Sequence, residues 1–245
     1  LDAFAPEART GAAAQTTFDA APWARFLDRY LVTEPPGSVH RVRYGAVTAE
    51  DLAALDRWLA ATQARGPDGL TRDAQFAWWV NLYNALTVRL ILDDPDVESI
   101  RDLGLLGTGP WGREVAEVDG RALSLDDIEH RILRPLFGDR GVHFAVNCAS
   151  VGCPDLAAEP WRAEDLDARL DAAVRSYLAH PRGLRFEDGR LRLSSIFDWY
   201  REDFPEGRTA FLAWLARYAP ESLRDRLRSY DGRIVHGYDW SLNAP

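Results

Sequence analysis

The two cysteines of the chain, Cys148 and Cys153, lie in one segment that also carries a histidine. Residues 141–156 read GVHFAVNCASVGCPDL, with His143 five positions before the first cysteine. A cysteine becomes a nucleophile when a nearby imidazole or helix N-terminus lowers its thiol pKa and another group orients the imidazole. This segment supplies both a thiol and an imidazole. We therefore expect any reactive site to lie here, with Cys148 as nucleophile and His143 as base.

The short apolar run at residues 142–146 predicts a buried strand, and the small and polar residues after it predict a loop. A group at the end of such a strand is held rigidly and still meets a substrate. In a regular strand, however, His143 and Cys148 face opposite sides and lie about 17 Å apart, so the chain must fold back for them to meet. His130 and His236 are alternative bases.

A second candidate group comes from the helix predicted at residues 125–137, which Ser124 caps. Glu129 lies inside the apolar stripe of this helix, about 40° around the axis from Leu125, whereas His130 points to the flank. A carboxylate on a buried face needs a partner or a raised pKa, and such positions are enriched at working sites. Glu129 is therefore the candidate that orients the imidazole.

Residues 71–92 predict the longest helix, which is apolar nearly all round and therefore central and buried. Asn81 and Asn84 interrupt that apolar surface on one face of the helix. A buried amide without hydrogen bonds costs about 1–3 kcal/mol, so both must have partners. Either they tie the helix to the backbone of a neighbouring loop, or they bind a substrate as carbonyl or oxyanion donors.

The cysteines have two other interpretations. The C-x4-C loop contains a glycine and can reach disulfide geometry, and a ring of this size stabilises a protein by about 2 kcal/mol. Dithiol exchange is only weakly indicated, because redox sites usually have C-x-x-C spacing. Cys148, Cys153, His143 and His130 are suitable residue types for zinc, but no pair has a recognised ligand spacing. We therefore predict no metal and no cofactor.

The composition restricts the partners. The 245 residues carry a formal net charge of −9, which argues against nucleic acid as a partner. The chain has no lysine, which excludes Schiff-base chemistry. No apolar run reaches the ~18 residues of a membrane span. We expect a small molecule or a peptide as the ligand and no spanning of a membrane.

The fold class predicted from these patterns is α+β, as a single domain. We expect the long helix at residues 71–92 to pack with other helices against a small sheet that includes residues 142–146. Residues 1–20 are small and polar and predict a loose N-terminal arm before one globular domain at residues 21–245. The start LDAFAPEARTGAAAQ is typical of a chain whose signal peptide has been removed, which predicts an exported, periplasmic or extracellular protein.

Five sequence blocks occur in order along the chain: WWVNLYNALTV (78–88), LSLDDIEHRILR (123–134), VHFAVNCASVGCPDL (142–156), LSSIFDWYREDF (193–204) and YDWSLN (238–243). In these blocks the chain resembles the bacterial domain-of-unknown-function 547 family. Bacterial members of that family commonly look like exported proteins, and the family name assigns no activity. The resemblance implies that the following residues lie in family motifs: Asn81, Asn84, Glu129, His130, His143, Cys148, Cys153 and Asp203.

A strand that bears a histidine and packs on a long central helix also looks like the papain/transglutaminase superfamily. In that superfamily the nucleophile lies at the start of the central helix, where this chain has residues 78–81 and no cysteine. The likeness therefore implies a permuted order, with His143 before Cys148.

Our working hypothesis is a thiol-dependent hydrolase or acyl transferase acting on a peptide or amide-like substrate. The nucleophile is Cys148, the base is His143 or His130, Glu129 orients the base, and the donors are Asn81 and Asn84. The alternative is a non-enzymatic exported binding or scaffold module whose loop is locked by a Cys148–Cys153 disulfide.

Overall fold

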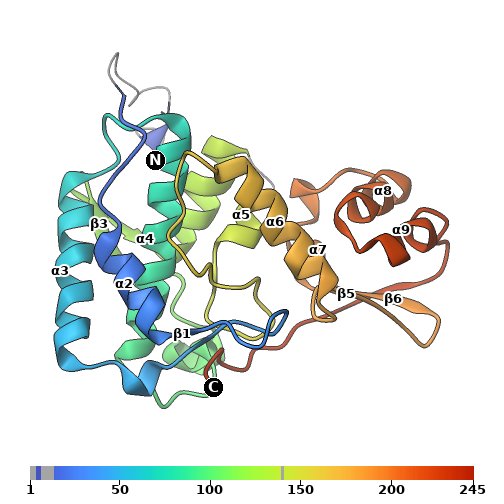
Figure 1. Cartoon of the computed structure of the whole chain (residues 1–245), viewed down its shortest axis with the longest axis horizontal. Helices are drawn as coiled ribbons and strands as arrows, with labels where there is room; N and C mark the ends of the chain where they lie inside the picture. Colours follow the sequence, from blue (N-terminus) through green and yellow to red (C-terminus); the bar gives the residue numbers. More distant parts are fainter. Residues whose placement is uncertain (1–3, 7–13, 139–140) are drawn as a thin grey trace.

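The computed structural model describes residues 4–6, 14–138 and 141–245 of the chain. Figure 1 shows two parts joined side by side: a larger helical part and a smaller C-terminal part, with helix α6 (Leu166–Ala179) running between them. Helices dominate and the sheets are small, which confirms the predicted α+β class.

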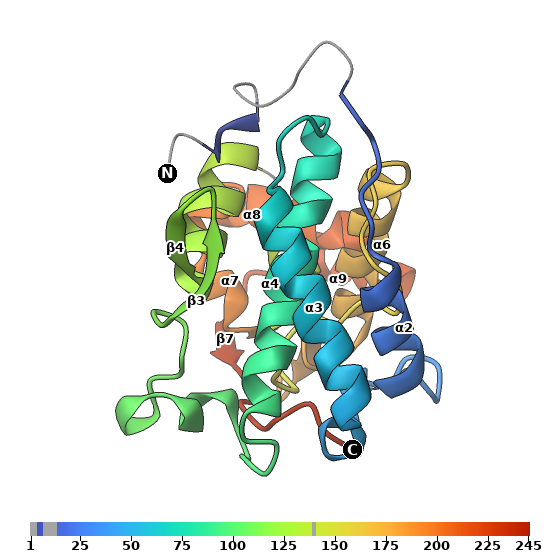
Figure 2. The same cartoon turned by 90° about the vertical axis from the view of Figure 1, so that its left-hand side faces the viewer.

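The larger part is built around α4 (Arg72–Leu92), the predicted central helix. Its N-terminus is capped by Thr71, whose side chain accepts a hydrogen bond from the backbone N–H of Ala74. Buried residues cover nearly its whole circumference, so the expectation of a central buried helix is confirmed. In Figure 2, α3 (Ala49–Arg65) lies in front of α4, and α2 (Ala21–Tyr30) lies next to α3.

The strands within the described ranges form three small sheets. Two of them are antiparallel pairs, and in the third an antiparallel hairpin gains a parallel strand from near the C-terminus. Their bounds are β1 (Leu31–Val32) with β2 (Arg41–Val42), β3 (Glu114–Val118) with β4 (Arg121–Ser124), and β5 (Leu184–Glu187) with β6 (Arg190–Ser194) and β7 (Ile234–Gly237).

Shorter helices complete the fold. These are η2 (Tyr44–Ala46), η3 (Ile100–Leu103), η4 (Leu105–Gly107), the π-helix η5 (Asp127–Phe137), α5 (Val142–Ala145), α7 (Ile196–Trp199), η6 (Arg201–Asp203), α8 (Arg208–Tyr218) and α9 (Glu221–Arg228).

The predicted strand at residues 142–146 is wrong, because this run forms the one-turn helix α5 and pairs with no sheet. A short apolar run fits a buried strand and a buried helix equally well, so its periodicity could not decide between them. The N–H of Val146 donates to the carbonyl of Val142 at 3.1 Å and closes the helical turn, and the Asn84 amide bonds the carbonyl of Ala145 and the N–H of Asn147 at its end. A helical rise of about 1.5 Å per residue, in place of about 3.3 Å, also brings His143 closer to Cys148 than a strand allows.

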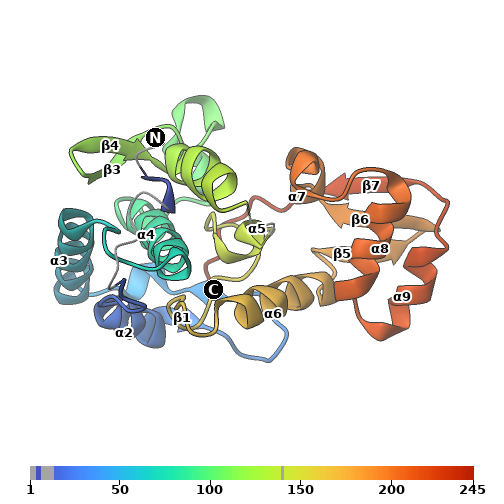
Figure 3. The ribbon, with the colours of Figure 1, turned by 90° about the horizontal axis from the view of Figure 1, so that it is seen from above.

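Two hydrophobic cores lie in the two parts, and α6 contributes to both. Its first half places Leu166 and Leu170 in the core around α4, and its second half places Val174 and Tyr177 in the C-terminal core. Figure 3 shows the helix passing from one part to the other. One continuous helix that is buried at both ends couples the parts, which agrees with the single-domain prediction.

The described part of the predicted N-terminal arm packs on the domain and is not loose there. Phe4 is fully buried, with its ring 5.1 Å from that of Trp79 in an edge-on contact. The N–H of Gln15 donates to the carbonyl of Gly69 at 2.8 Å. Residues 1–3 and 7–13, on which the arm and signal-peptide predictions also depend, lie outside the described residues.

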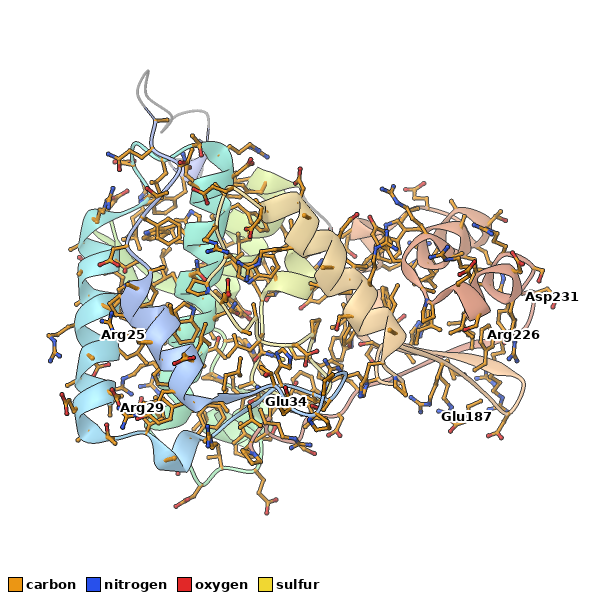
Figure 4. All side chains as sticks on the ribbon, in the orientation of Figure 1. Arg25, Arg29, Glu34, Glu187, Arg226 and Asp231 are labelled. Carbon is orange, nitrogen blue, oxygen red and sulfur yellow. The ribbon has the colours of Figure 1, made fainter. Side chains whose placement is uncertain are left out.

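Charged side chains lie mainly on the outside. Figure 4 labels Glu187, Arg226 and Asp231 at the far end of the C-terminal part, away from α4. Arg226 covers the ring of Phe186 there, with its guanidinium carbon 3.8 Å from the ring centroid. Among the described residues, no helix combines the length and the apolar character that crossing a membrane requires.

Candidate functional site

A cavity of about 660 Å³ opens between η5, α5 and the C-terminal tail. All four residues predicted to be catalytic lie on its wall, together with the second cysteine: Glu129, His130, His143, Cys148 and Cys153. They come from the π-helix, the one-turn helix and the loop after it. The structure therefore brings together side chains of separate sequence blocks at one concave site.

Aromatic rings also line this cavity. Tyr238 packs between Trp199 and Trp240, with ring centroids 4.8 Å and 4.6 Å away. Trp111 extends the wall, 5.6 Å from Trp240. Trp199 keeps 44% of its surface exposed, so a ligand can reach the wall. Aromatic rings bury large flat areas of a ligand, while the polar side chains of a pocket orient it.

The π-helix η5 carries Glu129 into the cavity. Ser124 lies just before the helix, and its hydroxyl accepts the N–H of Asp127 at 3.1 Å while its own N–H donates to the Asp127 carboxylate. Glu129 is buried, and one of its oxygens accepts the Tyr83 hydroxyl at 3.0 Å. Long π-helices are rare and often occur at functional sites. Glu129 is therefore a buried carboxylate on the cavity wall with one hydroxyl partner.

His143 is buried and held on two sides. Its Nε2 lies 2.6 Å from Oδ2 of Asp203, and its ring stacks on Tyr200 with centroids 4.2 Å apart. The other ring nitrogen, Nδ1, is buried without a hydrogen-bond partner and faces Oε1 of Glu129 at 3.9 Å. Asp203, rather than Glu129, is therefore the carboxylate that orients the imidazole.

Asp203 and Arg134 are parts of the site whose role the sequence did not reveal. Nε of Arg134 donates to Asp203 at 2.7 Å, and its guanidinium also contacts Glu202 and Nδ1 of His130, at 2.7 Å and 3.3 Å. The hydrogen bond from His143, with Arg134 beside it, holds the pKa of Asp203 well below its usual range. The only sequence signal for Asp203 was its place in the LSSIFDWYREDF block.

The two cysteines are free thiols in contact with each other. Their sulfur atoms are 2.8 Å apart, and Cys148 is half-buried whereas Cys153 is buried. Sγ of Cys148 also lies 3.1 Å from the hydroxyls of Ser150 and Tyr238. Burial raises the pKa of the Cys148 thiol, but hydrogen bonds with Cys153, Ser150 and Tyr238 outweigh it and lower the pKa to about 7. Burial and the neighbouring Cys148 raise the pKa of Cys153 well above its usual value.

The C-terminal tail holds the cysteine loop in place. The N–H of Asn243 donates to the carbonyl of Ala149 at 2.9 Å, and the N–H of Gly152 donates to the carbonyl of Asp239 at 2.8 Å. A Cβ on Gly152 would lie 2.8 Å from the backbone of Asp239, so only glycine allows this approach. Asn147 closes the loop from inside by donating to the carbonyl of Pro154 at 2.8 Å. The YDWSLN block therefore holds the cysteine loop through backbone hydrogen bonds.

Asn81 and Asn84, predicted as substrate donors, are not among the residues that line this cavity. Asn81 exchanges two hydrogen bonds with the backbone of Trp161, both 2.9 Å long. Asn84 donates to Ala145 at 2.9 Å and accepts from Asn147 at 2.8 Å. The nitrogen and the oxygen of each amide have a backbone partner. This matches the alternative interpretation that the two side chains tie α4 to neighbouring loops.

The alternative bases differ in their position. His130 lies on the cavity wall, with its Nε2 3.6 Å from Asp126. His236 is not on that wall and faces Asp198 at 3.9 Å. Among the described residues, no hydrogen bond joins a histidine to Cys148. Within the same ranges, no group of three or more His, Cys, Asp or Glu side chains is placed to hold a metal ion.

Residues 67–178 match the family described as "Protein of unknown function, DUF547". The predicted family resemblance is confirmed. The DUF547 match spans α4, η5, α5 and the cysteine loop, whereas Asp203 and Tyr238 lie beyond it. No match to the chain was found among curated proteins or among solved structures. The likeness to the papain/transglutaminase superfamily loses its main support, because it depended on a strand bearing His143 and that residue lies on a helix.

Proposed function

We propose that this chain is a thiol-dependent hydrolase or acyl transferase that attacks a peptide or amide-like carbonyl with Cys148. One observation supports this most strongly: a half-buried thiol with a pKa lowered to about 7 opens into a cavity that two histidines and a glutamate also line. A thiol with this pKa is about half ionised near neutral pH, and the thiolate is the reactive form.

The hydroxyl of Tyr238, which lines the cavity, takes the donor role first predicted for Asn81 and Asn84. It lies 3.1 Å from the Cys148 sulfur, where the substrate carbonyl would arrive. Burial, and then the negative charge of Cys148, raise the pKa of Tyr238 well above its usual value, so it keeps its proton. A retained proton makes Tyr238 a hydrogen-bond donor to the negative oxygen that forms in the transition state.

A leaving amine needs a proton, and His143 is the group proposed to supply it. Asp203 fixes the imidazole through Nε2, which leaves Nδ1 as the ring atom free to exchange a proton. Glu129, 3.9 Å from that atom, stabilises the charged imidazole when it forms. Water then hydrolyses the thioester on Cys148, or another nucleophile accepts the acyl group.

The test uses p-nitrophenyl acetate as an activated acyl donor and the reduced full chain. We expect a burst of nitrophenolate and an acetyl group that peptide mapping places on Cys148. Cys148→Ala should lose both. His143→Gln should still be acetylated but turn over more slowly, by about 10²–10⁴-fold, as for loss of general acid–base catalysis. An equal burst in Cys148→Ala, or no acetyl group on Cys148, would refute the proposal.

A second candidate is an exported binding or scaffold module whose loop is locked by a Cys148–Cys153 disulfide. The 2.8 Å between the sulfurs favours it, because closing the bond needs little movement. Thiol titration of protein purified without reductant separates the two candidates. Two titratable thiols argue for the enzyme. No thiols, together with no acetylation after reduction, argue for the locked module.

A further inference from the structure

The contact between the two sulfurs suggests an activity beyond acyl transfer. Cys148 and Cys153 lie 2.8 Å apart, and a disulfide bond is about 2.05 Å long. The N–H of Cys148 donates to Sγ of Cys153 at 3.0 Å, so the backbone of one cysteine holds the sulfur of the other. Bond formation would therefore need only a small movement of the side chains.

The two thiols are also unequal in access. Cys148 is half-buried on the cavity wall, whereas Cys153 keeps only 5% of its surface exposed. An incoming molecule therefore meets Cys148 first. Cys153 is the more buried of the two, and its sulfur lies 2.8 Å from Sγ of Cys148, the atom it must attack to release a sulfur bonded to Cys148. An accessible attacking thiol with a second thiol behind it is the arrangement of dithiol exchange.

We propose that Cys148 and Cys153 form a dithiol–disulfide couple that exchanges two electrons with disulfides of small thiols or peptides bound in the aromatic cavity. The proposal depends on one element of the proposed function, namely that Cys148 is a nucleophile facing this cavity. The C-x4-C spacing argued against redox chemistry in the sequence, but the folded loop brings the sulfurs as close as a shorter spacing would.

The reaction proceeds in two balanced steps. The Cys148 thiolate attacks one sulfur of the substrate disulfide, forms a mixed disulfide and releases the other substrate sulfur as a thiolate. Cys153 then loses its proton and attacks Sγ of Cys148, which releases the second substrate thiolate. The chain is oxidised by two electrons, the substrate is reduced by two, and the protons from the two cysteines end on the two thiols released.

The pKa values of the two cysteines fit these roles. The pKa of Cys148 is lowered to about 7, so the attacking sulfur is ionised near neutral pH. Burial and the neighbouring Cys148 keep Cys153 protonated until the first step consumes the Cys148 thiolate. The tail clamp on Gly152 and Ala149 holds the loop, so the exchange needs no refolding.

The experiment uses glutathione disulfide as the probe and intact mass with peptide mapping as the readout. In the reduced wild type we expect an internal Cys148–Cys153 disulfide and two released glutathiones per chain. In Cys153→Ser we expect a stable glutathione adduct on Cys148, and in Cys148→Ser we expect no product. A mixed disulfide as the end product in the wild type would overturn the proposal, as would an adduct on Cys153 in Cys148→Ser.

A measurement without variants guards against misfolding. The wild type is equilibrated in buffers of reduced and oxidised glutathione, and its thiols are counted. We expect the count to fall from two to zero with the squared dependence on reduced glutathione that an internal disulfide requires. A count that stays at two in every buffer, or that follows a first-power dependence, contradicts the proposal.

The two proposals fail separately. Acetylation of Cys148 in Cys153→Ser, with no internal disulfide in the wild type, removes the dithiol couple and leaves the acyl transferase. An internal disulfide without any acetylation does the reverse. If neither adduct forms on Cys148, both proposals fail.

Discussion

Two sets of buried polar side chains, one on α4 and one on α5, differ in how completely their hydrogen bonds are satisfied. Asn81 and Asn84 on α4 make four hydrogen bonds of 2.8–2.9 Å, all to backbone groups. His143 has one strong partner, Asp203, and one buried nitrogen with none. The asparagines are closed off, whereas His143 borders a cavity.

This difference separates a structural polar residue from a reactive one. Both sets interrupt apolar surfaces in the sequence, and both were predicted to lie at the site. A buried polar group with all its bonds made to backbone stabilises the fold, because breaking any bond leaves an unsatisfied partner. A buried group with an unused atom beside a cavity keeps chemical capacity at some cost in stability. The number of unused atoms therefore distinguishes the two roles.

The largest expected effect is on the asparagine side of this comparison. Asn84→Ala leaves the Ala145 carbonyl and the Asn147 N–H without partners, at about 1–3 kcal/mol each. We expect the free energy of unfolding to fall by about 3 kcal/mol in urea denaturation. Gln63→Ala is the matched control, because the Gln63 amide also bonds a backbone N–H, that of Glu117, but at an exposed position. An equal fall in the free energy of unfolding in both variants would show that the buried bonds of Asn84 stabilise the fold no more than an exposed bond does.

An intermediate effect is expected for Asp203→Asn, which removes the charge shared by His143 and Arg134. We expect a loss of about 1–2 kcal/mol at neutral pH in urea denaturation, the strength of a charged hydrogen bond reduced for partial exposure. Because the pKa of Asp203 is lowered in the folded state, its contribution is full above the unfolded value of about 3.9.

That contribution disappears as the pH falls below about 4 toward the folded pKa, since the carboxylate then takes up a proton. The difference between wild type and Asp203→Asn should therefore shrink in acid. Glu202→Gln is the control, because Glu202 contacts the same Arg134 from an exposed position and should change stability far less. A difference that is constant with pH would show that Asp203 acts through packing and not through charge.

The smallest effect sharpens the cavity side of the comparison. In the wild type, the Tyr238 hydroxyl lies 3.1 Å from the Cys148 sulfur and lowers the pKa of that thiol. Tyr238→Phe removes this hydroxyl. We expect the pKa of Cys148 to rise by about 0.5–1 unit, equivalent to about 1 kcal/mol. The rate of iodoacetamide labelling against pH measures it. Tyr218→Phe, which lies outside this cavity, should leave the profile in place, and an unshifted profile in Tyr238→Phe would exclude the hydroxyl as a thiolate partner.

The local elements were predictable because their signals lie within a few residues. Thr71 and Thr48 accept hydrogen bonds at the starts of α4 and α3, where the sequence placed the first of these helices. Ser124 bonds Asp127 at the start of η5, as its spacing indicated. These contacts join residues three positions apart, so they depend on the local sequence and can be predicted without the tertiary structure.

Features that depend on contacts between distant segments could not be predicted from the sequence. The run at residues 142–146 forms a helical turn whose end is held by Asn84, 63 positions before Asn147, and so distant a contact leaves no local signal. The strand β7 was not predicted, since it pairs in parallel with β6 across about 40 residues of chain. The role of Asp203 was missed because its partner, His143, lies 60 positions away.

The sequence by itself determined the central helix, the Ser124–Asp127 contact before η5, the family resemblance and the residue types able to do chemistry. Only the tertiary structure decided which of those side chains keep an unused atom, since their hydrogen-bond partners come from distant segments. The C-terminal tail that clamps the cysteine loop is about 90 residues from Cys148, and Tyr238 at its start contacts the thiol directly. Short-range order is encoded by neighbouring residues, whereas the chemistry of a buried polar group depends on what the rest of the fold places against it.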